Sequence, residues 1–370
     1  MLIYAATAAT GQNTQVEPDD YRNWSVLALP VTGYSPDLGV ILGGSAILMY
    51  GPDIGVPDEI ATGAQANTAS LIAMYTTHGS FVLGGGVQQY LADDRWLLNG
   101  RIGFSKTPSE YWGTGPGTKP TDNEEYTADS YSIQLGAGWE TVTHLYLGLR
   151  MTYQYYALSN LEVTGELHDM GLGTGITDPY TTSGHFSTLG TWLRYDSTEG
   201  NSSPYRGNKA DVELKTCSQA WNCTMDFSLL TINLRQYRRI FRSHVLALQA
   251  VYRQGFGSIP FFELPDLGGS TFRGYASGRF RDAAALSLQT EYRIPLPGRF
   301  GLVGFVGIGQ VGPTPADMFL SAVSAGDIKI AGGAGLRFRV GNIRQGLNIR
   351  LDGAVSPEGF KVYINAGEAF

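Results

Sequence analysis

The sequence predicts an all-β protein that forms a sixteen-stranded antiparallel transmembrane β-barrel, and three observations lead to this prediction. The 370 residues include 49 glycines and 21 tyrosines, and only 16% of them are charged. No stretch approaches the roughly 18 consecutive apolar residues that a membrane-spanning helix needs. Apolar residues instead recur at every second position. A transmembrane barrel hides its apolar surface in such an alternation, which agrees with the near-neutral mean hydropathy of -0.09.

The alternation is clearest in three segments, residues 131–141, 144–158 and 286–296. In the second segment one side carries large apolar residues, namely Leu145, Leu147, Leu149, Met151, Tyr153 and Tyr155. The opposite sides of the three segments carry Gly, Ser, Thr, Gln, Glu and Arg. A soluble sandwich would turn its large apolar side inward. These segments therefore predict an apolar outer surface and a wet, hydrogen-bonded lumen.

Runs of this kind, bounded by turn residues, predict sixteen strands. They span residues 24–34, 39–50, 67–78, 80–92, 95–106, 128–141, 144–157, 186–196, 208–216, 226–239, 244–256, 283–296, 299–311, 327–339, 346–355 and 359–370. An even number of strands puts both termini of the chain on the same, periplasmic side of the membrane. The long connections 107–127, 158–185, 257–282 and 312–326 then face outside, and the alternate connections are mostly short, with 196–208 as an exception. This asymmetry is typical of outer-membrane barrels.

The ends of the chain complete this division. Residues 1–23 precede the predicted barrel of residues 24–370, and they resemble either a remnant of a secretory signal or a short periplasmic or lumenal extension. The last predicted strand carries Phe360 on its apolar side and ends at Phe370. Glu368 shares that side, so we expect its carboxylate at the membrane interface rather than in lipid.

Several function classes are disfavoured by the composition. The net charge of -7 argues against a nucleic-acid partner. Cys217 and Cys223 are the only cysteines, and in an oxidising compartment they predict a small loop-closing disulfide rather than a metal site. The five histidines are scattered and no G-x-S-x-G motif is present. We therefore expect no enzyme activity, no metal and no cofactor.

Residues 267–282, LGGSTFRGYASGRFRD, combine glycines and serines with aromatic residues and three arginines. Together with the strand that follows, this segment resembles the hallmark of the BamA/TamA superfamily of outer-membrane assembly and translocation barrels, also called the bacterial surface antigen family. In that family a long extracellular loop before the twelfth strand folds back into the lumen. Its Arg-Gly-aromatic motif pins the arginine against acidic and aromatic residues of the next two strands. The corresponding residues here are Phe272, Arg273, Gly274, Tyr275, Glu291 and Phe305.

The resemblance implies a clamp in which Arg273 reaches Glu291 within the lumen. The alternative is an exposed loop arginine, worth about 0 to 1 kcal/mol as a surface pair. Gly307 stands where the family has a second acid, so one carboxylate of the clamp is expected to be missing. Arg279, Arg281 and Arg293 are further candidates for lumen charges, with solvated loop charges as the alternative for the first two. Weaker resemblance lies in LPVTGYSPDLGVILGG, YWGTGPGT and RYDSTEGNSSPYRGN.

The resemblance also implies a function: assisting a protein or lipid-linked client to insert into or cross the bacterial outer membrane. In the family this involves the seam between the first and last strands, where Trp24, Phe360 and Phe370 are expected here. Members that insert or secrete proteins carry periplasmic POTRA domains, and with 23 residues before the first strand we expect this chain to be a barrel-only member without one. Expected partners are outer-membrane lipid, lipopolysaccharide, a protein client or periplasmic partner, and a second copy of the chain. A passive pore, a structural barrel and the membrane anchor of a larger complex are the alternatives.

Overall fold

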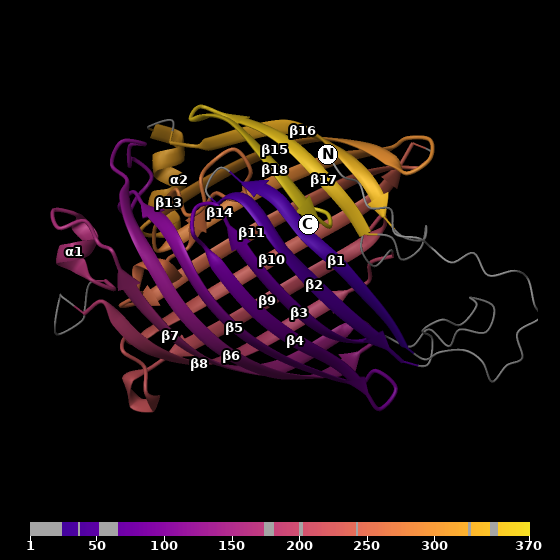
Figure 1. The fold of residues 1–370 in the computed structure, drawn as a ribbon, viewed down its shortest axis with the longest axis horizontal. Coiled ribbons are helices and arrows are strands. Elements are labelled where there is room, and N and C mark those ends of the chain that lie inside the picture. Colours follow the sequence, from indigo (N-terminus) through magenta and orange to yellow (C-terminus); the bar gives the residue numbers. More distant parts are fainter. Residues whose placement is uncertain are drawn as a thin grey trace, which may run out of the picture.

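The fold is that of a computed structural model, which describes residues 24–35, 38–51, 66–173, 181–199, 203–241, 243–324, 327–340 and 347–370. Most of these residues lie in one sheet that curves into a barrel (Figure 1). The segment expected before the barrel, residues 1–23, lies outside the described residues.

Within the described residues the main sheet has sixteen strands, and each pairs antiparallel with the next strand of this sheet along the chain. The strands are β1 (Trp24–Ser35), β2 (Gly39–Tyr50), β3 (Asn67–Thr76), β4 (Phe81–Leu91), β5 (Trp96–Tyr111), β6 (Glu124–Val142), β7 (Leu145–Ser159), β8 (Ser183–Asp196), β9 (Gly207–Cys217), β10 (Phe227–Ile240), β11 (His244–Gly257), β14 (Ala284–Pro295), β15 (Phe300–Gly312), β16 (Lys329–Val340), β17 (Leu347–Ser356) and β18 (Gly359–Ala366). A separate pair, β12 (Asp266–Leu267) and β13 (Phe280–Arg281), lies within the connection from β11 to β14.

Helices occur only in connections within the described residues. They are α1 (Glu166–Met170), α2 (Pro315–Ser324) and the 3-10 turns Gln219–Trp221 and Phe261–Glu263. No described helix is long and apolar enough to cross a membrane.

The apolar sides of the strands face outward, as the alternation predicts. On β7, Leu147, Leu149 and Met151 expose 51%, 66% and 61% of their surface. Arg150, between two of them, turns inward and forms an ion pair with Glu213 of β9. The outer surface is therefore apolar and the inner surface carries paired charges, the arrangement that suits a bilayer outside and a wet lumen inside.

Two strands extend further than their alternation predicts. The ladder between β5 and β6 continues to the pair Tyr111 and Glu124. This extension lies under a hydrophobic cluster in which Tyr111, Tyr126 and Phe261 are buried, and each tyrosine ring forms a T-shaped contact with the ring of Phe261. Packing of loop residues thus stabilises the two strands beyond the alternating part of their sequence.

The last strand, in contrast, is shorter than predicted and ends at Ala366 rather than at residue 370. Gly367 follows with a φ of 86°, a conformation that glycine adopts without strain. Its amide donates to the carbonyl of Asn348 on β17, and the chain then leaves the sheet. β18 lies beside β1 (Figure 1), but no ladder joins these two strands in the part of the chain that the structure describes.

Candidate functional site

The connection between β11 and β14 folds into the barrel and forms its own apolar core there. Leu267, Phe272, Tyr275 and Phe280 are buried and form a cluster with small residues of β14, β15 and β16. Phe272 and Tyr275 stack with their ring centroids 5.8 Å apart. This lumen loop, residues 258–283, is therefore packed inside the barrel and is not a solvated surface loop.

Gly274 allows the tip of the lumen loop to approach the wall closely. Its φ is 113°, and a Cβ atom at this position would lie 2.8 Å from the Cβ atom of Ala331 on β16. Its amide donates to the Tyr363 hydroxyl on β18 at 3.1 Å, and its carbonyl accepts from the Ser356 hydroxyl on β17 at 2.7 Å. Because both partners belong to the last hairpin of the sheet, the loop tip fixes that hairpin from the inside.

Arg273 is the centre of the site, and the structure brings it together with Glu291 and Phe305. Its Nη2 atom lies 2.6 Å from Oε1 of Glu291 on β14. The carbon of its guanidinium lies 3.7 Å from the ring centroid of Phe305 on β15, within cation–π distance. Glu291 and Phe305 therefore hold the lumen loop through Arg273, which is the contact that the resemblance implies.

The expectation that one carboxylate is missing was wrong. Asp352 on β17 supplies it, with Oδ2 at 2.6 Å from Nη1 of Arg273. Gly307 has a different role, because a Cβ atom there would lie 3.0 Å from the ring of Phe272. The glycine makes room for the loop aromatic, and the second acid comes from a strand that lies beyond the segment on which the resemblance rests.

Arg279 and Arg281 bind within the protein rather than to solvent. Arg279 is buried, with Nη2 at 2.8 Å from a carboxylate oxygen of Glu358, in the turn between β17 and β18. Its Nη1 atom donates to the hydroxyl of Thr118 at 2.8 Å. Arg281 donates to the carbonyls of Gly278 and Phe261, both at 3.1 Å. The contacts of Arg279 tie the lumen loop to two other connections, and those of Arg281 hold the loop together internally.

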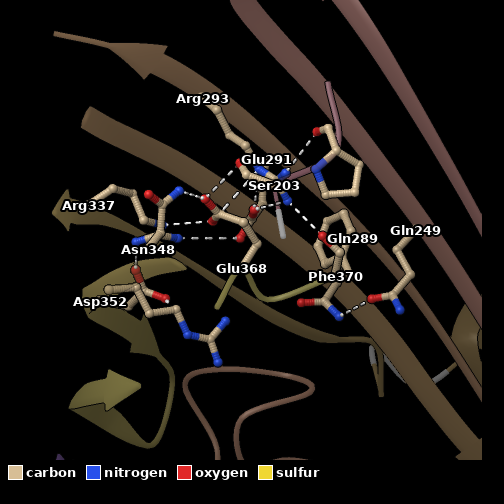
Figure 2. A network of polar contacts seen from close by, with 12 residues as sticks. Ser203, Gln249, Gln289, Glu291, Arg293, Arg337, Asn348, Asp352, Glu368 and Phe370 are labelled. Atoms are coloured by element: carbon tan, nitrogen blue, oxygen red, sulfur yellow. Dashed lines mark hydrogen bonds and ion pairs between the residues drawn. The ribbon is translucent and has the colours of Figure 1, made fainter. Parts of the chain in front are cut away.

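Arg293 extends the charged site beyond Arg273 (Figure 2). Its Nη2 atom lies 2.9 Å from Oε2 of Glu291, the carboxylate that also binds Arg273. Arg337 on β16 is linked in the same way, because it donates to the second carboxylate oxygen of Asp352. Both carboxylates are fully buried, and each bridges two arginines. Buried carboxylates that each bind two guanidiniums form a rigid network, because removing any member leaves a buried charge with fewer partners.

Glu368 belongs to this network, so its expected place at the membrane interface was wrong. Its carboxylate accepts from Nε of Arg337 at 2.8 Å and from Nδ2 of Asn348 at 2.6 Å (Figure 2). Burial raises the pKa of Glu368, but Arg293 and Arg337 outweigh this effect and hold the pKa below its ordinary value.

Phe370 also lies inside, which corrects its expected place on the outer seam. Its exposed fraction is 8%, whereas Trp24 and Phe360 on the seam strands expose 50% and 66%. Phe370 packs in a cluster with Tyr237, Val245 and Ala247 of β10 and β11. The glycine at position 367 is the one sequence signal for this inward turn.

Other predicted groups lie away from the network. A disulfide joins Cys217 and Cys223 beside the connection from β9 to β10. Among the described residues, no group of three or more His, Cys, Asp or Glu could hold a metal ion. A cavity of about 820 Å³ lies beside the lumen loop, and its lining includes Glu110, Trp112, Glu125, Ser270, Arg281 and Tyr363.

Comparisons with known proteins agree with this architecture. The sequence of residues 66–357 matches the Omp85 superfamily domain. No curated protein sequence matches the chain significantly.

Solved structures with a similar fold include the following three. BamA from Haemophilus ducreyi lacking POTRA domains 1-3 matches with a TM-score of 0.61 and 15% identity, over 93% of this chain and 70% of that one. CdiB from Acinetobacter baumannii matches with a TM-score of 0.55 and 10% identity, over 94% of this chain and 60% of that one. CdiB from Escherichia coli matches with a TM-score of 0.57 and 10% identity, over 94% of this chain and 62% of that one. The chain thus spans less than two thirds of either CdiB chain.

Proposed function

Because the chain belongs to the Omp85 superfamily, we propose that it is an integral barrel of the bacterial outer membrane that helps a protein or lipid-linked client to insert into or cross that membrane. In this proposal the sheet forms the wall of the barrel, and its first and last strands, β1 and β18, lie side by side. The connections that carry α1 and α2 face outside, and the mouth near Phe370 faces the periplasm.

The junction between β1 and β18 is the observation that carries this proposal. A Cβ atom on Gly33 of β1 would lie 2.7 Å from the carbonyl oxygen of Ile364 on β18. If β18 continued antiparallel from this contact, residues 367–370 would run alongside roughly residues 27–30 of β1. Residues 368–370 instead turn into the lumen. Within the described residues, no strand forms a ladder with residues 27–30 at the outer edge of β1.

An unpaired edge of this kind favours the capture of a client strand. Backbone N–H and C=O groups on a free strand edge form a template for pairing with another chain. The lumen loop holds the other side of the junction in place through Ser356 and Tyr363. A client would therefore add to β1 while β17 and β18 stay anchored.

Site-specific crosslinking in the native membrane tests this function. A photoreactive amino acid is placed at Val26, which is exposed on β1, and in a matched control at Leu149, which is exposed on β7. We expect protein adducts from Val26 that are absent from Leu149. Equal adducts with lipid from both positions, and no protein adduct from Val26, would contradict the proposal.

A passive pore is the second candidate, and the cavity of about 820 Å³ favours it. Conductance across a planar bilayer separates the two functions. A lumen occupied by the loop predicts small, flickering currents. Large and steady channels would instead indicate a pore.

A further inference from the structure

The segment Gly367–Phe370 occupies a pocket inside the barrel that binds both its acidic and its aromatic side chain (Figure 2). We propose that this pocket is a peptide-binding site. Its ligand is a three-residue sequence in which an acidic residue is followed by any residue and then by an aromatic residue, and Glu368–Phe370 fill the site as an internal ligand. The proposal rests on the proposed function in one respect, because a client chain would supply the competing segment.

The half of the pocket that binds the acidic residue, here called the acidic half, is a carboxylate receptor. Arg337 and Asn348 donate to different oxygens of Glu368, at 2.8 and 2.6 Å. The Ser203 hydroxyl donates to one of these oxygens at 3.3 Å, and Nε of Arg293 lies 4.0 Å from the other. A guanidinium and neutral donors together select a carboxylate, since an amide in its place would remove one of the two carboxylates that bind Arg337.

The aromatic half adjoins the acidic half through Arg293. The Nη2 atom of Arg293 donates to the main-chain oxygen of Phe370 at 2.8 Å, and the guanidinium carbon lies 5.7 Å from the centroid of its ring. Tyr237, Val245 and Ala247 form the buried apolar wall around that ring. Arg293 therefore contacts both the backbone and the ring of the residue two positions after the acidic residue.

The connection between β8 and β9 covers the pocket from across the mouth of the barrel. Ser203 contacts Glu368 as described, and the carbonyl of Pro204 accepts from Nη1 of Arg293 at 3.4 Å. Tyr205 packs against the cluster around Phe370, and the guanidinium of Arg239 lies 4.3 Å from the Tyr205 ring centroid. A strand connection from the far side of the barrel thus contributes to the same pocket.

The pocket is built independently of the segment that fills it. Glu291 and Asp352 hold Arg293 and Arg337 through contacts that do not involve residues 367–370. The segment forms no ladder with a neighbouring strand and joins β18 through Gly367, so it can leave without disturbing β18. A departing Glu368 would leave Arg293 and Arg337 in place with one negative charge fewer beside them, and this site would attract another carboxylate.

A fluorescently labelled Gly-Glu-Ala-Phe peptide, the sequence of residues 367–370, provides the probe. Binding is measured by anisotropy on the full chain in detergent, for the wild type and for the double variant Glu368→Gln, Phe370→Ala. We expect the double variant to bind the peptide at least tenfold more tightly, because its internal ligand is weakened. The peptides Gly-Gln-Ala-Phe and Gly-Glu-Ala-Ala are expected to lose at least tenfold in affinity.

The comparison of the three peptides decides the test, because a change in the peptide does not affect the folding of the barrel. Equal binding of the three peptides would overturn the proposal and indicate partition into detergent. Equal affinity of the wild type and the double variant would overturn it as well. Crosslinking from Val26 reports on client capture by β1 and does not depend on this pocket, so the two proposals can fail separately.

Discussion

Arg273 and Asp352 lie 79 positions apart in the sequence, and their side chains meet at 2.6 Å inside the barrel. Glu291 binds the same guanidinium at the same distance. One arginine therefore joins the lumen loop to β14 and to β17, and both carboxylates are completely buried. The strength of this junction determines how firmly the loop stays in the lumen.

Arg273→Ala is expected to destabilise the folded barrel by about 3 to 5 kcal/mol, because it leaves two buried carboxylates short of a partner. The midpoint of heat-modifiable gel migration measures the effect. Arg253→Ala is the matched control: Arg253 pairs with Asp266 at 2.6 Å, but the two side chains are 26% and 30% exposed. Its loss should cost only about 0 to 1 kcal/mol. Equal shifts in the two variants would contradict the special role of Arg273.

Gly307→Asp is expected to destabilise the barrel, although it restores the acid that the family resemblance places there. The new Cβ atom would lie 3.0 Å from the ring of Phe272, and Arg273 already has two carboxylate partners. Displacing a packed aromatic ring costs about 1 to 3 kcal/mol. Gly304→Ala, on the same strand with no atom within 4 Å of the new Cβ, should leave the midpoint of heat-modifiable migration nearly unchanged. A higher midpoint for Gly307→Asp would restore the idea of a missing acid.

The positions of the strands follow from the sequence more directly than their ends do. Alternation predicts strands wherever one side faces lipid, since every second residue must then be apolar. It carries no information about the ends of β5 and β6, because burial of Tyr111 and Tyr126 under the loops extends them. Alternation also predicts the wrong end for β18. Gly367 turns the chain inward, although the apolar alternation continues past it in the sequence.

The site was predictable only in part, for a related reason. Arg273, Glu291 and Phe305 could be found because they lie in one hallmark segment and the strands next to it. Asp352 is one of many polar residues on an inward face, and nothing in its neighbourhood indicates that it meets a loop. Which inward residues meet depends on how far the loop reaches across the lumen, and the local pattern of a strand does not contain that distance.

Loss of the disulfide is expected to have a local and moderate effect. Cys217 and Cys223 are six positions apart, so the bond constrains a short loop and should contribute about 2 kcal/mol. The double variant Cys217→Ala, Cys223→Ala should therefore keep the barrel with a lower midpoint of heat-modifiable migration. Reductant should shift the wild type to the same midpoint and leave the double variant unchanged. A reductant effect on the double variant would show that the shift has another origin.

Acidification is expected to release the segment that contains Glu368. Its pKa lies below the ordinary value of 4.5 while the segment is held, because Arg293 and Arg337 favour the charged carboxylate more than burial disfavours it. A lowered pKa means that the stabilisation is complete above the ordinary pKa and is lost as the pH falls through the lowered value. A 4-fluorophenylalanine at position 370 reports the release through its fluorine chemical shift, which should change cooperatively below about pH 4.5. In Glu368→Gln the segment should be released at neutral pH and show no such transition. The same transition in that variant would show that the pH dependence does not come from Glu368.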